Sequence, residues 1–337
     1  YCLADQLKVI NGSQNVGGFA GNIQPGSAVT LNTSSNTGLL SKLLKYLLGN
    51  AGDLAKVLNA TLSIVDYAKV DAWNDYGLSV NGSYTLENDE TTKYAKQVGG
   101  FVGNAGGAIF GDKDANSVRV EANNIRNVVG GRDVGGFFGL ADVSSVAQVG
   151  NDDSDQILNL IKLGNIDVLD AFRTYVYQAK VTGSNDNGLS VCANDESQEG
   201  TLDSKVQTGN AGGFGGSLLD GSIKNSSVTG LNKVKAKNYA GGFVGHMGKS
   251  GVVDLDEAGV GTGKLLNATA GVLDIFGSHS DNCSVIGIPV GFTISSESGN
   301  EPISGGFVGY ADLGRMSNCN VENIKKVASD QIAGGFV

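Results

Sequence analysis

Residue types that carry out catalysis are scarce in this chain. The two histidines, His246 and His279, are expected to lie in different repeat units, so they form no catalytic triad and no histidine metal site. Arg132-Asp133 is the nearest approach to the charged pairs that cleave polysaccharides, and we expect a solvated pair in a turn. None of the glycine-rich sequences continues into the Gly-Lys-Ser/Thr of a phosphate-binding loop. The sequence therefore predicts no catalytic residue and no cofactor.

One acidic cluster resembles the start of a calcium-binding loop. Asp112, Asp114 and Asn116 have the spacing of the first EF-hand ligands. However, Ser117 replaces the glycine of that loop, and Asn123 replaces its bidentate glutamate. We favour a solvated turn here, with calcium as the second interpretation.

A second acidic cluster precedes a helical pattern. Asp152, Asp153 and Asp155 are three carboxylates within four residues, which would suit calcium. Serine and aspartate at such a position also cap the free N–H groups of a helix, which is the interpretation we favour. No metal is predicted from either cluster, and calcium stays open.

The four cysteines have two interpretations. Cys2, Cys283 and Cys319 share one phase of the repeat, and Cys192 lies near it. Free cysteines pack as small apolar side chains, so a buried column of thiols is the first interpretation. In the second, Cys283 and Cys319 lie on neighbouring coils about 4.8 Å apart, a distance that a disulfide tolerates. Cys192 and Cys283 would be two coils apart, too far to bond, and no pair has zinc-site spacing.

Composition excludes several classes of protein. The chain has 337 residues with 24 Lys and Arg against 34 Asp and Glu, a net charge of −10. This acidic balance makes nucleic acid and anionic membrane poor partners. No apolar run reaches the roughly 18 residues that a membrane span needs. Glycine is abundant, with 52 residues, but proline contributes only 3, which distinguishes the chain from disordered Pro/Gly-rich linkers.

The glycines recur in a motif, Gly-Gly-Phe, often followed by Val-Gly. The seven copies are Gly17-Gly18-Phe19, Gly99-Gly100-Phe101, Gly135-Gly136-Phe137, Gly212-Gly213-Phe214, Gly241-Gly242-Phe243, Gly305-Gly306-Phe307 and Gly334-Gly335-Phe336. Their spacings of 82, 36, 77, 29, 64 and 29 residues alternate between long and short. A fixed repeat of this kind is typical of a solenoid. The glycines would allow positive φ or close backbone approach at a tight corner.

A short unit has the size of one β-helix coil. In the unit that starts at Gly212 we expect three strands, at Phe214, near Ile223 and at Ser227-Val228. The seven phenylalanines would stack into one buried ladder, because regular stacking superposes residues of equal phase. Alternation would turn Val102, Val244 and Val308 outward or toward a packed insertion.

The long units carry insertions, which we place between the second and third strands. The segments at about 37–70, 154–180 and 261–277 have helical patterns and share sequence with one another, such as the repeated Leu-Asn-Ala-Thr. We expect them to project from one side of the solenoid on alternate coils. The predicted fold is mostly β: a right-handed β-helix that runs continuously over residues 1–337 as a segment of a longer chain.

The motif resembles the GLUG-type glycine-rich repeats of large bacterial surface proteins. The residues from Gly305 to Val321 carry the resemblance, with Gly-Gly-Phe-Val-Gly-Tyr, a glycine turn and Ser-Asn-Cys, and with Phe307 in place of the usual leucine. The helical insertions depart from that pattern. The resemblance implies a secreted or surface-attached protein of the adhesin or filament type.

The leading functional hypothesis is an extracellular structural or adhesive repeat, such as a surface stalk, adhesin shaft or filament subunit. Its partners would be copies of itself, neighbouring repeats, or glycans and proteins of nearby cells. One alternative is a β-helix polysaccharide-processing enzyme or tail-spike depolymerase, which should carry one coil-specific cluster of charged residues. The other is a partner-binding module that uses the helical insertions.

Overall fold

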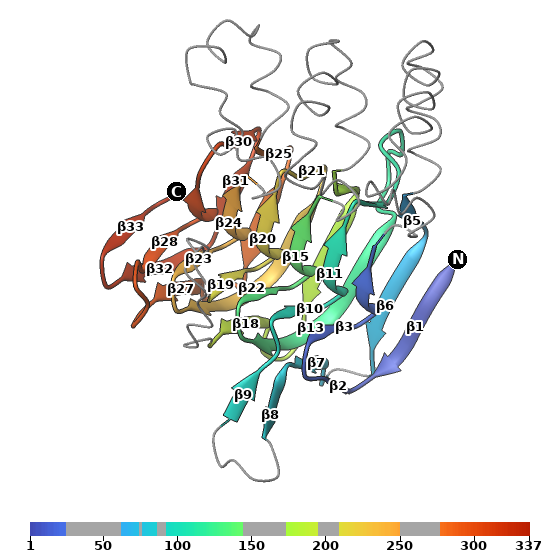
Figure 1. Cartoon of the computed structure of the whole chain (residues 1–337), viewed down its shortest axis with the longest axis horizontal. Coiled ribbons are helices and arrows are strands. Elements are labelled where there is room, and N and C mark those ends of the chain that lie inside the picture. The colour runs from blue at the N-terminus through green and yellow to red at the C-terminus, as the bar shows by residue number, and fades with distance from the viewer. Residues whose placement is uncertain (25–61, 74–75, 86–91, 144–172, 195–208, 250–276) are drawn as a thin grey trace, which may run out of the picture.

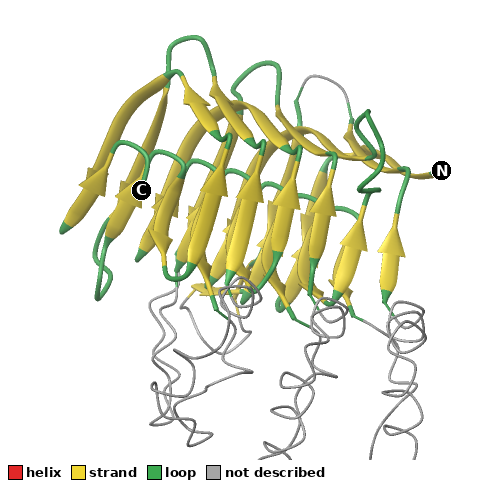
Figure 2. Cartoon of the chain, turned by 90° about the horizontal axis from the view of Figure 1, so that it is seen from above, coloured by secondary structure: helices red, strands yellow, loops and turns green. Residues whose placement is uncertain are grey.

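Parallel β-strands make up the regular structure of this protein. The computed structural model describes residues 1–24, 62–73, 76–85, 92–143, 173–194, 209–249 and 277–337. Those residues contain strands and no helix, arranged in four parallel sheets and one small antiparallel hairpin. Figure 1 shows the sheets running side by side from the N-terminal to the C-terminal end, and Figure 2 shows the strands of successive passes stacked beside one another.

The chain passes through the four sheets in a fixed order, and we call one pass a coil. Sheet 1 contains β3 (Asn15–Gly17), β10 (Gln97–Gly99), β14 (Asp133–Gly135), β19 (Asn210–Gly212), β23 (Tyr239–Gly241), β28 (Ile303–Gly305) and β33 (Ile332–Gly334). Sheet 2 contains β4 (Ala20–Ile23), β11 (Val102–Gly106), β15 (Phe138–Asp142), β20 (Gly215–Leu219), β24 (Val244–Gly248) and β29 (Val308–Ala311). Sheet 3 contains β5 (Ser63–Val65), β12 (Ala108–Phe110), β16 (Tyr175–Tyr177), β21 (Ser222–Lys224), β25 (Ser278–Asp281) and β30 (Gly314–Ser317).

Sheet 4 is the widest, and its longer strands bend to form two walls. It contains β1 (Cys2–Leu7), β2 (Val9–Asn11), β6 (Ala68–Ala72), β7 (Leu78–Asn81), β13 (Val120–Gly130), β17 (Ala179–Gly183), β18 (Leu189–Ala193), β22 (Ser227–Ala236), β26 (Ser284–Gly287), β27 (Phe292–Ser296), β31 (Asn320–Glu322) and β32 (Ile324–Ser329). The hairpin pairs β8 (Ser83–Thr85) with β9 (Thr92–Tyr94). The parallel sheets are compatible with a β-solenoid.

The motif lies at the corner between sheets 1 and 2. The first glycine of each copy pairs with the first glycine of the next, as in Gly99 with Gly135. A Cβ on Gly136 would stand 2.1 Å from the Gly213 carbonyl oxygen of the next coil. Close approach of two backbones, rather than positive φ, therefore explains the glycine at this position.

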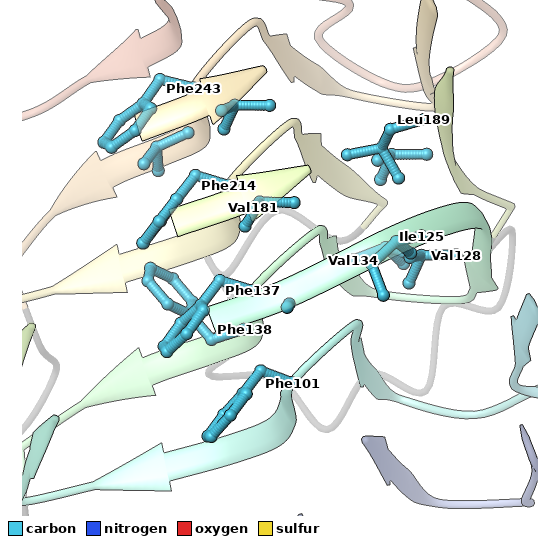
Figure 3. Close-up of a cluster of buried hydrophobic side chains, with 14 of the residues drawn as sticks. Phe101, Ile125, Val128, Val134, Phe137, Phe138, Val181, Leu189, Phe214 and Phe243 are labelled. Carbon is cyan, nitrogen blue, oxygen red and sulfur yellow. The ribbon is translucent and has the colours of Figure 1, made fainter. Parts of the chain in front are cut away.

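The phenylalanine rings stack along the molecule. Successive ring centroids are 4.7 to 5.0 Å apart through all seven copies, close to the spacing of neighbouring strands. The five central rings are fully buried, those of Phe101, Phe137, Phe214, Phe243 and Phe307, whereas the Phe336 side chain is 37% exposed. Figure 3 shows four of the stacked rings within the core. The ladder expected from the motif phase is therefore present.

Several local expectations were wrong. A coil crosses four sheets rather than three, because a three-residue strand ends at the first glycine of each pair. The residues Val102, Val244 and Val308 are buried in the core rather than turned outward. Each insertion lies between the strand of sheet 2, which follows the phenylalanine, and the strand of sheet 3. The predicted position was one strand later, after the strand of sheet 3.

Two predicted helical segments end in strands. Residues 63–65 and 68–70 belong to β5 and β6, and residues 175–177 and 179–180 belong to β16 and β17. Left-handed backbone at Tyr67 and Gln178 (φ 50° and 52°) marks the corner between each strand pair. Sheet pairing therefore overrides the helical pattern at these positions. The remainder of the insertions, 37–61, 154–172 and 261–276, lies outside the described residues.

Candidate functional site

The three insertions share one anchoring geometry. Ser63, Thr174 and Ser278 occupy one column at the start of sheet 3, each directly after an insertion, and we call them the hydroxyl column. Each hydroxyl donates to a carbonyl oxygen on the other side of its insertion, that of Gln24 at 2.9 Å, Asp142 at 2.6 Å and Gly248 at 2.8 Å.

Coils without an insertion lack this hydroxyl. The same column holds Ala108, Gly221 and Gly314 on the alternate coils, where the strands of sheets 2 and 3 follow each other closely. The hydroxyl therefore accompanies the insertion, and it closes the coil across the base. Sequence reasoning missed this column, although a Ser or Thr at the start of each strand that follows an insertion was a visible signal.

A buried arginine links the bases of two insertions. Arg173 Nε donates to the carbonyl oxygen of Asp220 at 2.7 Å, and its Nη2 donates to the carbonyl oxygen of Gly277. The Asp220 carboxylate accepts a hydrogen bond from the Gly277 N–H at 2.5 Å. These bonds connect the end of the second insertion to the end of the third through the turn of the coil between them.

Asp133 is buried rather than solvated, contrary to expectation. Its Oδ1 accepts hydrogen bonds from Ser217 Oγ at 2.5 Å and from Asn210 Nδ2 at 3.3 Å. Burial raises the pKa of the carboxyl, and the Ser217 hydrogen bond partly offsets that effect. The three side chains come from three strands of sheets 1 and 2, so the cluster connects neighbouring coils.

The two histidines lie in the same coil, not in different repeat units, but in different sheets. His246 belongs to β24 of sheet 2 and His279 to β25 of sheet 3. The His246 ring lies 5.4 Å from the Tyr239 ring and 5.5 Å from the Tyr310 ring. Burial lowers the pKa of His246 to about 4, so this side chain is neutral near pH 7.

We expect His246 to make the protein acid-sensitive. A histidine whose pKa falls from 6.5 to about 4 on folding binds fewer protons when folded, so its contribution to stability is complete above pH 6.5 and is lost as pH falls toward 4. A difference of this size corresponds to about 3 kcal/mol. Urea unfolding between pH 7 and pH 4.5 should therefore show a shallower acid loss for His246→Gln than for the parent. Equal slopes for the parent and the His246→Gln variant would contradict the prediction.

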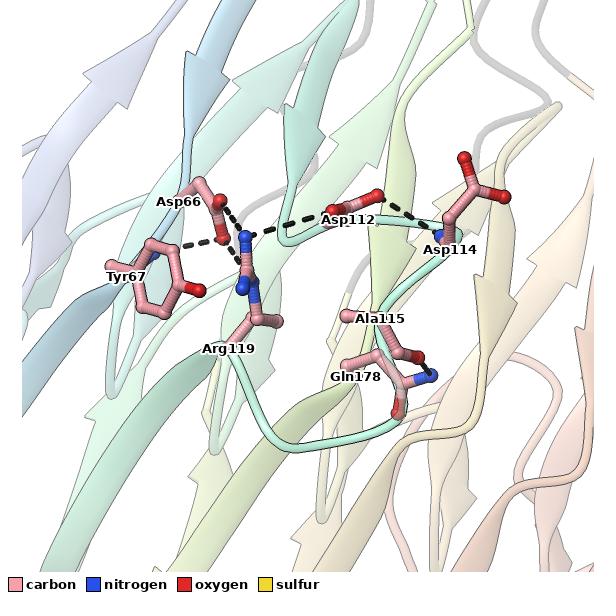
Figure 4. A network of polar contacts seen from close by, with 7 residues as sticks. All are labelled: Asp66, Tyr67, Asp112, Asp114, Ala115, Arg119 and Gln178. Carbon is pink, nitrogen blue, oxygen red and sulfur yellow. Dashed lines mark hydrogen bonds and ion pairs between the residues drawn. The ribbon is translucent and has the colours of Figure 1, made fainter.

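Arg119 supplies the positive charge beside the first acidic cluster. Its Nε donates to Asp66 Oδ1 at 2.9 Å, its Nη2 lies 3.6 Å from Asp112 Oδ2, and its guanidinium lies 3.5 Å from the centre of the Tyr67 ring. The hydrogen bond from Arg119 lowers the pKa of Asp66. Figure 4 shows this network.

The calcium candidates of the first cluster form a turn. Asp112 Oδ1 accepts a hydrogen bond from the Asp114 N–H at 2.9 Å, and Asp112 Oδ2 faces Arg119. The loop is fastened to the neighbouring coil because Gln178 Nε2 donates to the Ala115 carbonyl oxygen. Within the described ranges, no three His, Cys, Asp or Glu residues form a group that could hold a metal ion. Asp152, Asp153 and Asp155 lie outside those ranges.

A polar hollow of about 460 Å³ lies next to this loop. Uncharged amide and hydroxyl side chains from four consecutive coils line it: Asn116, Gln178, Asn225, Ser226, Ser227, Asn282 and Ser284. Within it Asn282 Nδ2 donates to Asn225 Oδ1 at 2.7 Å across neighbouring coils. Side chains of this kind can both donate and accept hydrogen bonds, which suits a neutral, hydroxyl-rich ligand.

All four cysteines are free thiols in this structure. Cys283 is buried, Cys192 and Cys319 are partly buried, and Cys2 is exposed. Cys283 and Cys319 lie at equivalent positions of consecutive coils, whereas Cys192 lies in β18, which pairs with the later part of β22, away from their column.

Parallel strands of successive coils stack beside one another in register, an arrangement that is compatible with a β-solenoid. The family model for the GLUG motif matches residues 207–235, so the chain carries a GLUG-type repeat there. That segment covers the fourth motif copy and the strands β19 to β21 with most of β22. No curated protein and no solved structure matches the chain. Among the described residues, no helix is long and apolar enough to cross a membrane.

Proposed function

We propose that this chain is part of an extracellular structural or adhesive protein, such as a surface stalk, an adhesin shaft or a filament subunit. The coils would form one right-handed β-helix, with helical insertions that project from one side. No catalytic activity is proposed for it. Its partners would be neighbouring repeats or further copies, and the glycans or proteins of nearby cells.

One observation carries the proposal: the phenylalanine stack continues through all seven motif copies with steps of 4.7 to 5.0 Å. A stack in which each coil contacts mainly its neighbours can be extended without a change of fold, which suits a shaft. The acidic net charge of −10 suits a solvated surface. The GLUG-type repeat at 207–235 supports the same proposal.

Imaging and localisation of the native material test the proposal. We expect negative-stain micrographs to show rods with an axial repeat, and protease added to intact cells to remove the protein. Compact particles, or a protein that is protected until the cells are lysed, would refute it.

The polar hollow favours a second function, adhesion to a neutral glycan. Its lining has no charged side chain and spans four coils, so an extended sugar chain could lie along the coil axis. Immobilised neutral polysaccharides should retain the chain, and Asn225→Ala with Asn282→Ala should reduce retention. A matched pair of substitutions outside the hollow, Asn22→Ala with Asn104→Ala, should not. Failure of every neutral polysaccharide to retain the parent chain would exclude this function while leaving the shaft proposal intact.

The alternative of partner binding through the insertions requires that the coils tolerate their removal. Residues Gln24 and Ser63 occupy the same columns as Gly106 and Ala108, which a single residue, Gly107, connects. We expect replacement of residues 25–62 by one glycine to leave a folded protein whose melting temperature changes by only a few degrees. Circular dichroism melting curves measure the melting temperature. The control is Ser63→Ala in the full chain, which removes the hydroxyl bonded to the Gln24 carbonyl oxygen and keeps the insertion. Unfolding of the shortened chain would show that the first insertion is part of the folding core.

A depolymerase is the other alternative. The candidates for an acid–base pair are Asp133, whose pKa burial raises, and His246, which is neutral near pH 7, and both side chains make contacts between coils. We therefore assign them to stability, not to catalysis. Release of reducing ends from a polysaccharide by the purified chain, abolished by Asp133→Asn in a folded variant, would reverse that assignment.

A further inference from the structure

Cys283 and Cys319 occupy equivalent corners of the last two coils. The residues that follow them are in register, since Ser284 pairs with Asn320, and the Asn320 N–H donates to the Cys283 carbonyl oxygen at 3.1 Å. Each cysteine follows an asparagine with left-handed backbone, Asn282 (φ 51°) or Asn318 (φ 52°). The two Cα atoms therefore have the separation of neighbouring parallel strands, about 4.8 Å, within the range that a disulfide spans.

Both thiols turn toward the interior from this corner. Cys283 Sγ lies 3.3 Å from the Asp281 carbonyl oxygen, and Cys319 Sγ lies 3.1 Å from the Ser317 carbonyl oxygen and 3.6 Å from that of Ser280. Both cysteines thus lie at one corner of neighbouring coils that are in register, and no change of strand register is needed to join them.

We propose that Cys283 and Cys319 form a redox-active dithiol that oxidises reversibly to a disulfide between neighbouring coils. In the extracellular setting of the proposed function, thiol–disulfide exchange would oxidise the two thiols. Only this statement about where oxidation occurs rests on the proposed function. The bond would add a covalent link between the last two coils, which backbone pairing, packing and side-chain hydrogen bonds such as that from Ser317 Oγ to Asp281 Oδ1 already hold together.

The environments of the two thiols give them different roles. Cys319 is partly exposed, and the hydrogen bond from Cys283 lowers its pKa to about 7, so a large fraction is thiolate at neutral pH. Burial raises the pKa of Cys283, which stays protonated until it reacts. Cys319 is therefore the first nucleophile and Cys283 the resolving thiol.

The reaction balances with a small disulfide, RSSR, as oxidant. The Cys319 thiolate attacks one sulfur of RSSR, a mixed disulfide forms, and RS⁻ leaves and takes up a proton. Cys283 then loses its proton and attacks the Cys319 sulfur, so that the Cys283–Cys319 bond forms and the second RSH leaves. The protein gives up two electrons and two protons, and RSSR is reduced to two RSH.

Oxidised glutathione is the probe that tests the proposal on the purified chain. After treatment, alkylation and proteolysis, we expect two of the four thiols to be lost and mass spectrometry to find one linked peptide pair, Cys283 with Cys319. The melting temperature should rise on the order of 5 °C, because the bond restricts the unfolded chain, and dithiothreitol should reverse the rise. Four free thiols after treatment, or a link between any other pair, would overturn the proposal.

Matched variants separate the two roles. Cys283→Ser should stop at a glutathione adduct on Cys319, and Cys319→Ser should leave the buried Cys283 largely unmodified, whereas Cys192→Ser should still form the link. An adduct on Cys283 in the Cys319→Ser variant would contradict the order of attack. If protein from cells carries free thiols but the purified chain forms the link, the extracellular location is wrong and the redox site stands.

Discussion

Replacing Phe137 by alanine is expected to lower the free energy of unfolding by about 3–5 kcal/mol. The ring is fully buried and stacks on Phe101 at 4.8 Å and on Phe214 at 5.0 Å, with the edge of Phe110 at 5.6 Å. Its removal leaves a cavity that these rigid neighbours cannot fill by small movements. Urea unfolding followed by circular dichroism measures the change.

Phe336→Ala is the matched control for this substitution. Phe336 has the same motif position, but its side chain is 37% exposed and only one ring of the ladder, Phe307, stacks on it. We expect its replacement to cost about 1 kcal/mol, an ordinary value for a partly exposed site. Similar losses for the two variants would show that the ladder does not stabilise the coils. Because each coil contacts mainly its neighbours, hydrogen exchange should report the loss of Phe137 in its own coil and in the adjacent coils of Phe101 and Phe214.

Replacing Gly136 by alanine should be more damaging than the loss of a ring, with a cost above about 4 kcal/mol. The new Cβ would meet the Gly213 carbonyl oxygen at 2.1 Å, together with side-chain carbons of Leu189 at 2.9 Å and Val181 at 3.0 Å. Backbone atoms cannot rotate away as a flexible side chain can, so the two coils must separate locally. We expect low soluble yield or a strongly lowered melting temperature.

Gly335→Ala tests whether this effect comes from the close contact. Gly335 has the same place in the last motif copy, but a Cβ there would meet no atom within 4 Å. Its replacement should leave the melting temperature nearly unchanged. A comparable loss for both variants would mean that an intrinsic requirement of the glycine backbone, and not the approach of the next coil, explains the motif.

Stacking could be predicted from the sequence because it depends on phase alone. Residues of equal phase superpose in a regular stack, which is sufficient to bring together the seven phenylalanines and also Cys283 with Cys319. The strand that ends at the first glycine of each pair was missed because three residues such as Asn210–Gly212 carry too little pattern to be recognised. Residues 63–70 were assigned to a helix because local periodicity does not register pairing with strands 45 or more residues away.

Contacts across neighbouring coils in the candidate sites were beyond sequence reasoning for a different reason. The burial of Asp133 depends on Ser217 and Asn210, which lie 84 and 77 residues further along the chain. Arg119 is likewise paired with Asp66 across 53 residues. Because the insertions differ in length, such partners cannot be found by a fixed offset, and only the coil register brings them together.

The hydroxyl column has a consequence for how this protein can evolve. Each insertion leaves and re-enters the coil at two residues joined by one short hydrogen bond, and the bonded residues are 39, 32 or 30 positions apart in the sequence. Lengthening such a loop adds little entropic cost, about 0.6 kcal/mol for each doubling. We therefore expect mutations, deletions and duplications inside an insertion to disturb the coils little. Under selection, the inserted sequences would then diversify faster than the coils that carry them.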